Sequence, residues 1–174
     1  MSARPSPDEV GMPYLIDGCN LLCAIRNNDE RFEPVDEVRL CWTLGRYLTQ
    51  IGDSGELVFD GSGPNDKGRF DHIPGLAVSF AGIGRDADGV IEEKIKTHAS
   101  SHPLILVSND RRLRQSALHH KASVIHAEAF WEKVLKEVNK KRPAPEPTAK
   151  RHGLSESETE VWLKAFGIKE KEDP

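Results

Sequence analysis

Residues 103–110 read Pro103-Leu-Ile-Leu-Val-Ser-Asn-Asp110, with four consecutive aliphatic side chains followed by three polar ones. A strand that is apolar without alternation is typical of a parallel sheet buried on both faces. We therefore expect this segment to lie at the centre of a sheet, with helices packed on both sides. The polar residues that follow would end the strand at an edge of that sheet.

Four further short apolar runs have the character of strands: 14–17, 56–60, 76–80 and 122–126. Segments with apolar residues near helical spacing alternate with them, at 35–51, 87–98, 111–121 and 129–140. This alternation indicates βαβ units. It predicts an α/β fold with a mainly parallel five-stranded sheet and helices on both faces. Residues 61–75 show no helical pattern and are expected to form a long loop.

The chain of 174 residues is long enough for one domain and a tail. We place the domain at residues 13–140, after a flexible N-terminus at 1–12. Residues 141–154 are rich in proline and basic residues, and are expected to be an extended linker. A capping box then predicts an amphipathic helix at 155–167. Its Trp162 and Phe166 are expected to pack either on the chain's own domain or on another chain, and we favour a protein partner or a second copy of the chain.

The composition argues against several classes of protein. The net charge is −4 at pH 7, whereas a protein that simply coats nucleic acid is often basic. No apolar run approaches the roughly 18 residues that cross a membrane, and the first residues lack the apolar core of a secretory signal. The three cysteines cannot all pair and show no zinc-site spacing. We therefore expect free thiols and a cytoplasmic location.

Acidic residues recur where the predicted strands end. Asp17, Asp60 and Asp110 each lie at, or within two residues of, the C-terminal end of a strand. More acids occupy the first two turns of the helix after the third strand: Asp86, Asp88 and Glu92. The C-terminal ends of parallel strands share one edge, and active sites form in the crevice there. We therefore expect these carboxylates to face one cleft.

Each acid taken alone has a structural explanation, because aspartate caps helices well and Asp60-Gly61 is an ordinary turn signal. As a set, carboxylates without counter-charges repel one another, which favours a functional site. Oxygen ligands without histidine or cysteine suit Mg²⁺ or Mn²⁺ rather than zinc. Such a site supports the hydrolysis of phosphate esters.

The segment Gly82-Ile-Gly-Arg-Asp-Ala87 matches the GxGxxA pattern of dinucleotide-binding proteins. It follows the third strand rather than the first, and Asp86 would face the pyrophosphate. A tight turn that brings Asp86 and Asp88 into the cleft explains these glycines better.

Four motifs occur in an order known from one family: Asp17-Gly-Cys-Asn20, Val58-Phe-Asp60, Asp88-Gly-Val-Ile-Glu92 and Val107-Ser-Asn-Asp110-Arg. With the segment Ser123–Trp131, they resemble the NYN domain and, within it, the YacP-like branch of the PIN-like ribonuclease superfamily. The resemblance covers about residues 13–140. It implies a Rossmann-like PIN fold and a metal-dependent endoribonuclease.

The resemblance also implies roles for individual residues. Asp17, Asp88 and Asp110 would be catalytic metal ligands, Asp60 a further ligand, and Asn20 would orient a water or a phosphate. Asp86 and Glu92 are weaker candidates for the metal. Two departures from the family pattern, Cys19 in place of an aromatic residue and Asn109 beside the expected acid, remove no carboxylate.

Basic residues near the same edge are candidates to bind the phosphates of RNA, although each also fits a solvated helix face: Arg26, Lys67, Arg69, Arg111, Arg112 and Arg114. The leading hypothesis is a Mg²⁺- or Mn²⁺-dependent ribonuclease acting on RNA that is single-stranded or ribosome-associated. The alternative is a non-catalytic RNA- or ribosome-binding adaptor. A receiver-like phosphoacceptor domain would need adjacent acids after the first strand and a lysine after the last, and the sequence has neither.

Overall fold

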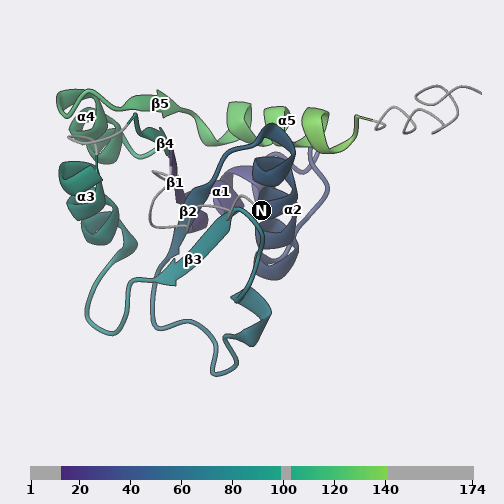
Figure 1. Cartoon of the computed structure of the whole chain (residues 1–174), viewed down its shortest axis with the longest axis horizontal. Helices are drawn as coiled ribbons and strands as arrows, with labels where there is room; N and C mark the ends of the chain where they lie inside the picture. Colours follow the sequence, from purple (N-terminus) through teal and green to yellow (C-terminus); the bar gives the residue numbers. More distant parts are fainter. Residues whose placement is uncertain (1–12, 99–102, 141–174) are drawn as a thin grey trace, which may run out of the picture. The chain divides into compact units, whose positions relative to one another are not determined.

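The structure is a computed structural model that describes residues 13–98 and 103–140. Five parallel strands form one sheet in the order β3-β2-β1-β4-β5 (Figure 1). The strands are β1 (Tyr14–Asp17), β2 (Gly55–Phe59), β3 (Leu76–Phe80), β4 (Ile105–Val107) and β5 (Ser123–Ile125). The α-helices are α1 (Gly18–Arg26), α2 (Glu37–Ile51), α3 (Ala87–His98), α4 (Arg111–His119) and α5 (Ala127–Val138). The predicted α/β fold is confirmed.

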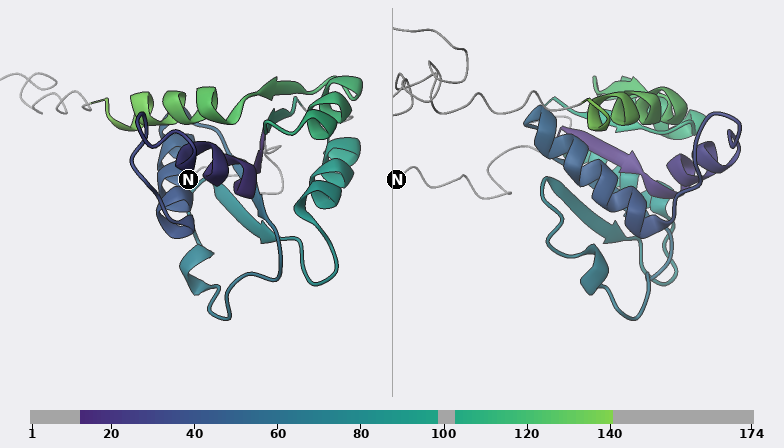
Figure 2. Two further views of the ribbon diagram at one scale, coloured as in Figure 1. Left: turned by 180° about the vertical axis from the view of Figure 1, so that it is seen from behind. Right: turned by 90° about the vertical axis from the view of Figure 1, so that its right-hand side faces the viewer.

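Helices cover both faces of the sheet, as Figure 2 shows. Helices α1, α2 and α5 enclose one apolar core, and α3 and α4 enclose another. Successive residues of a strand point to opposite faces. Tyr14 and Ile16 therefore join the first core, and Leu15 joins the second. This two-sided burial explains why the strands read as continuous apolar runs.

The strand order contains one switch point. Strands β2 and β3 follow β1 along the chain and lie on one side of it. The chain then crosses through α3, and β4 and β5 lie on the other side of β1. Ligands of open α/β sheets bind in the crevice at the carboxyl ends of the strands that flank such a point. Here those strands are β1, which ends at Asp17, and β4, which Ser108 follows directly.

Two features differ from the sequence-based expectation. The central strand is β1, whereas β4, which we expected at the centre, lies beside it. Helix α1 was not predicted, because Asp17 ends β1 and caps α1 at once, leaving no connecting residue to mark a boundary. Gly18 is required at this junction, since an added Cβ would lie 2.6 Å from the ring of Phe59.

The long loop between β2 and β3 is partly anchored. It contains a short 3-10 turn, η1 (Gly68–Phe70), and the ring of Phe70 is buried against Phe59 and Phe80. The loop therefore packs on the first core through an aromatic residue, while Lys67 and Arg69 remain exposed.

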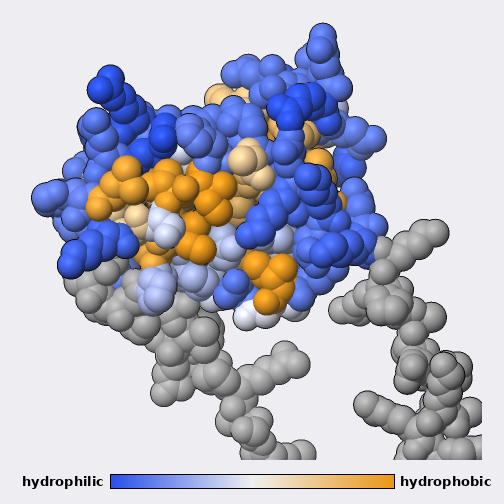
Figure 3. Space-filling model, turned by 90° about the horizontal axis from the view of Figure 1, so that it is seen from above, coloured by the Kyte–Doolittle hydropathy of each residue, from blue (hydrophilic) through white to orange (hydrophobic). Residues whose placement is uncertain are grey.

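The surface combines hydrophilic areas with a distinct apolar one, on the face seen in Figure 3. Leu118 is 62% exposed, and the edge strand β5 leaves Val124 and Ile125 half-buried. Exposed apolar side chains beside an edge strand are features of surfaces that contact other chains. Within the described ranges, no helix is both long and apolar enough to span a bilayer.

The expectations for the N-terminus at 1–12, the linker at 141–154 and the amphipathic helix at 155–167 lie outside the described residues.

Candidate active site

Asp17 stands at the centre of the carboxyl edge and is 4% exposed. Its Oδ1 accepts a hydrogen bond of 3.0 Å from the backbone N–H of Asn20, which caps α1. Its Oδ2 accepts one of 3.1 Å from the hydroxyl of Ser108. Burial raises the pKa of Asp17 from 3.8 to about 6, against the effect of both hydrogen bonds, and the charges of Asp88 and Asp60 raise it further.

Ser108 connects the ends of β1 and β4. Its hydroxyl donates to Asp17 and also accepts a hydrogen bond of 3.0 Å from the backbone N–H of Asp110. Asp110 in turn caps α4, because its Oδ1 accepts from the N–H of Leu113 at 2.9 Å. One buried hydroxyl thus holds two of the predicted catalytic carboxylates in a fixed relation. Ser108 lies in the motif Val107-Ser-Asn-Asp110, but its spacing alone indicates no functional role.

Asn109 joins three elements at the same edge. Its backbone N–H donates to the side-chain oxygen of Asn20 at 2.8 Å. Its own amide group donates to both oxygens of Glu128, at 2.8 and 2.9 Å, and its side-chain oxygen accepts from the N–H of Ala127. The Asn20 oxygen therefore holds the backbone of Asn109, which leaves the amide nitrogen of Asn20 for the predicted role of orienting a water or a phosphate.

A second group of acids comes from the end of β2 and the start of α3. Asp60 accepts a hydrogen bond of 2.7 Å from the N–H of Ala87, and Asp86 accepts one of 2.8 Å from the N–H of Gly89. Both carboxylates thus stabilise the first turn of α3. The side chain of Asp88 makes no hydrogen bond within the part of the chain that the structure describes, and the residue is half-buried in the first turn of α3.

The two groups act on each other electrostatically. The pKa of Asp88 is raised, first by burial and then by the negative charge of Asp110, with smaller contributions from Asp86 and Asp60. Arg112 opposes this rise. Carboxylates that raise one another's pKa lie within the range of their fields, so the structure brings together acids from four separate segments of the chain.

The donor set fits a hard divalent cation in chemistry and in charge, because it consists of carboxylate oxygens whose mutual repulsion a cation would relieve. Asp60 and Asp110 each use one oxygen as a cap, which leaves the other for a ligand. Within residues 13–98 and 103–140, no three acidic, thiol or imidazole groups are gathered closely enough to hold a metal ion as they stand. Side chains would have to turn to complete a metal centre.

The remaining predicted residues have other partners. Glu92 pairs with Arg112 at 3.2 Å and with Lys96 at 3.4 Å, so its charge is compensated. Arg26 pairs with Glu37 at 3.4 Å. Arg114 is half-buried, and its Nε lies inside the domain. By contrast, Arg69 and Arg111 are exposed and make no ion pair within the described ranges.

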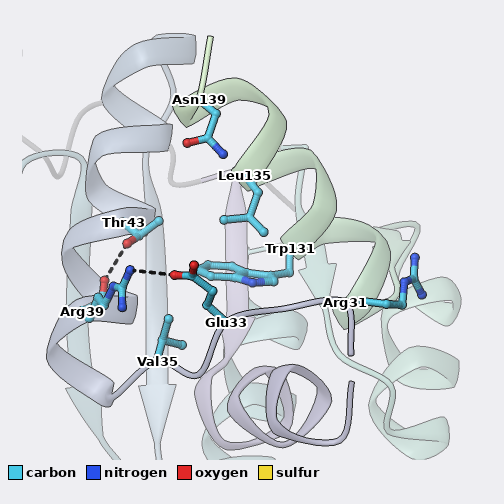
Figure 4. Close-up of a pocket in the computed structure, with 8 residues that line it drawn as sticks. All are labelled: Arg31, Glu33, Val35, Arg39, Thr43, Trp131, Leu135 and Asn139. Carbon is cyan, nitrogen blue, oxygen red and sulfur yellow. Dashed lines mark hydrogen bonds and ion pairs between the residues drawn. The ribbon is translucent and has the colours of Figure 1, made fainter. Parts of the chain in front are cut away.

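Two pockets lie near these elements. One of about 370 Å³ lies between α2 and α5, where Trp131 and Leu135 meet the Glu33–Arg39 ion pair (Figure 4). None of the clustered carboxylates lines it. The other, of about 290 Å³, is bordered by Asp60 and so adjoins the candidate active site.

A five-stranded parallel sheet with this strand order and acids at its switch point has the architecture of the PIN-like nuclease fold. The family model for the YacP-like NYN domain matches residues 14–166, and the chain belongs to that family. The match continues past Lys140, where the resemblance seen in the sequence was expected to end. The segment after residue 140 is therefore part of the family pattern as far as residue 166.

Solved structures agree on the fold. The crystal structure of Rae1 (YacP) from Bacillus subtilis is similar with a TM-score of 0.59 and 18% identity, covering 88% of this chain and 91% of that one. A tryptophan-to-leucine mutant of the same protein gives a TM-score of 0.54 and 19% identity, covering 71% and 75%. A search of curated proteins found no match for this chain.

Proposed function

We propose that this protein is a metal-dependent endoribonuclease that hydrolyses RNA phosphodiesters at the carboxyl edge of the sheet. The observation that carries the proposal is the buried Asp17 at the switch point, with a pKa of about 6 in the field of Asp88 and Asp60. A buried carboxylate among like charges is unfavourable for folding, and such groups occur where function requires them. Membership of a nuclease-like family supports the same conclusion.

Asp17, Asp60, Asp88 and Asp110 are the residues that would hold Mg²⁺ or Mn²⁺. The ion, when bound, would polarise the phosphate and stabilise charge on the leaving oxygen. Asp88, which no hydrogen bond holds among the described residues, has the freedom to accept a proton from an attacking water. Ser108 hydrogen-bonds to both Asp17 and Asp110, and Asn109 joins the end of β4 to Asn20 and Ala127. The role of these two residues is therefore to position the carboxylates.

The substrate we propose is RNA that is single-stranded or associated with the ribosome. Arg69 and Arg111 are exposed, and Lys67 is exposed beside the ring of Phe80, so these side chains are accessible to the phosphates of the RNA. Arg26 and Arg112 would have to leave their carboxylate partners to do the same.

The test is a cleavage assay on labelled single-stranded RNA with Mn²⁺, Mg²⁺ or EDTA. We expect cleavage with either ion, none with EDTA, and rates reduced about a hundredfold or more in Asp17→Asn, Asp88→Asn and Asp110→Asn. The matched control is Asp53→Asn, an exposed carboxylate at the other end of β2. Cleavage that survives in all three variants, with a contaminating nuclease excluded, would refute the site.

The second candidate is a non-catalytic RNA-binding adaptor. It is favoured by two observations: several of the acids already serve as helix caps, and no ready metal cluster is present among the described residues. An adaptor would bind labelled RNA equally well with and without divalent ions and would leave it intact. The cleavage assay therefore separates the two candidates directly.

A further inference from the structure

The pocket of about 290 Å³ lies at the carboxyl edge of the sheet, over the ends of β2 and β3. Its residues come from α1, from the first turn of α2 and from those two strands. They are Cys19, Leu22, Cys23, Arg26, Glu37, Phe59, Asp60 and Phe80. Asp60 belongs both to this pocket and to the carboxylate cluster, so the two sites are contiguous.

The walls and the ends of the pocket differ in character. One face of α1 presents residues at spacings of i, i+3 and i+4, namely Cys19, Leu22 and Cys23. Phe59 and Phe80 supply the opposite wall as a stacked pair with centroids 5.7 Å apart. The charged groups are Asp60, on the side of the carboxylate cluster, and the Arg26–Glu37 ion pair. The pocket is therefore apolar along its walls, with polar groups at few points.

This distribution of charge favours an uncharged ligand over a phosphate. The pocket has two carboxylates and one guanidinium, and the guanidinium is already paired. The lining residues offer a phosphate no unpaired cation, because Arg26 is paired with Glu37 and Lys67 lies over the ring of Phe80. An uncharged planar ring would contact the apolar walls, and its edge groups could accept from Arg26 and donate to Glu37.

We propose that this pocket is a subsite for one unpaired nucleobase of the RNA, adjacent to the phosphate at the carboxylate cluster. The inference rests on the proposed function. It adds to it the residues that would give the protein a preference for particular bases. Arg26 then acts in reading a base edge, together with Glu37, instead of binding a phosphate as the sequence suggested. Only an unpaired base can enter, so the subsite also selects single-stranded RNA.

The experiment uses the exposed thiol of Cys23 as a probe of occupancy. The full-length Asp17→Asn variant is mixed with a labelled RNA oligonucleotide, and binding is measured by fluorescence polarisation. The alkylation rate of Cys23 by N-ethylmaleimide is then followed by peptide mass spectrometry. At ten times the Kd we expect about tenfold slower alkylation with the normal oligonucleotide. An abasic oligonucleotide of the same length, at equal occupancy, should give no protection.

The outcomes distinguish the two proposals. If RNA binds by polarisation but the alkylation rate of Cys23 is unchanged, or if the abasic chain protects equally, the base subsite is refuted. Cleavage by the wild-type protein is unaffected by that result and still supports the proposed function. If the wild-type protein neither cleaves nor binds RNA, the proposed function fails, and the subsite fails with it.

In a second experiment, a larger side chain at Cys23 fills the pocket from its exposed side. Cys23→Trp should weaken binding of single-stranded RNA by about tenfold or more, the contribution of one stacked base, while its melting temperature stays that of the wild type. The matched control is Leu118→Trp, an exposed position at the C-terminal end of α4. Equal RNA affinity in the two folded variants would overturn the assignment.

Discussion

Asp17 combines two demands in one side chain. Its oxygens cap α1 and accept from Ser108, which requires an acceptor at this buried position. Its charge, however, is disfavoured by burial, and its pKa rises to about 6. The negative charge itself therefore lowers the stability of the metal-free protein. A neutral asparagine would keep the hydrogen bond from Asn20 through its oxygen, and its amide nitrogen would donate to the hydroxyl of Ser108.

The first prediction concerns the substitution Asp17→Asn in the presence of EDTA. The folded protein holds the proton of Asp17 more tightly than the unfolded chain does, because the pKa is 3.8 in its ordinary state and about 6 in the fold. This favourable contribution is fully present below pH 3.8 and is lost as the pH rises through about 6. The asparagine side chain carries no charge to bury, so the variant should be more stable than the wild type at pH 7.5, by about 1–3 kcal/mol.

Urea unfolding at pH 4.5 and 7.5 measures this difference. The gap between the variant and the wild type should widen with pH, whereas Asp53→Asn should change stability little at either pH. A variant that is less stable than the wild type at pH 7.5 would show that the charge of Asp17 is compensated in the folded protein.

The second prediction tests the contact between Asn109 and Glu128. Asn109→Asp replaces a donor with a second carboxylate, and we expect a loss of about 2 kcal/mol in the free energy of unfolding. Glu128→Gln restores a donor opposite the introduced carboxylate, so the double variant should recover most of that loss. A double-mutant cycle by urea unfolding gives the coupling energy, and a value near zero would contradict the contact.

At the scale of elements, the residues that build the strands and most helices could be recognised from sequence because burial on both faces leaves long apolar runs. Helix α1 was missed, since its N-cap is the last residue of β1 and no turn residue separates them. The strand order was also not predictable. Which strand is central depends on the crossover of α3. Neither the composition of a strand nor the spacing of its apolar residues indicates which strands lie beside it.

The start of α3 carries the third prediction. Asp86 accepts from the N–H of Gly89, so it has the geometry of a cap. Asp86→Ser keeps a side-chain acceptor and should preserve both stability and RNA cleavage, while Asp86→Ala should lose about 1 kcal/mol of stability. Thermal melts and the cleavage assay are run on both. Loss of cleavage in a fully stable Asp86→Ser protein would make Asp86 a metal ligand instead.

At the scale of the whole molecule, the gathering of acids was predictable, whereas their partners were not. Strand ends of a parallel sheet meet at one edge, and that rule brings Asp17, Asp60 and Asp110 together. The ion pairs of Arg26 with Glu37 and of Arg112 with Glu92 join residues that only the fold makes neighbours. Some of the arginines that the sequence suggested for RNA binding are therefore paired with carboxylates of the same domain.

The fourth prediction concerns metal binding by the intact protein. A cation that binds only the folded state stabilises it, by about 2.7 kcal/mol at a hundred times its Kd, and the melting temperature should rise by about 5–10 °C. Mn²⁺ and Mg²⁺ should produce this shift in the wild type. The double variant Asp17→Asn, Asp110→Asn should show none, and an equal shift in both proteins would place the ion elsewhere.

The fifth prediction is that deleting residues 143–174 leaves a folded nuclease. The two apolar cores within the described ranges are built from elements that end by Val138. The truncated chain should therefore unfold cooperatively in a thermal melt and should retain RNA cleavage, with a change in partner binding or oligomeric state. Loss of folding or of cleavage would mean that the segment shared with the family up to residue 166 is integral to the domain.

Several aspartates of the cluster also begin a helix: Asp17 caps α1, Asp110 caps α4, and Asp60 accepts from the first residue of α3. In a descendant without the proposed cleavage, selection for folding would still retain Asp60 and Asp110 for their hydrogen bonds to helix N-termini, whereas the unfavourable buried charge of Asp17 would no longer be needed. The presence of Asp60 and Asp110 in a distant descendant is thus a poor guide to whether it remains an enzyme. Substitutions would therefore accumulate first at Asp88, which caps nothing among the described residues, and at Asp17, whose charge disfavours folding.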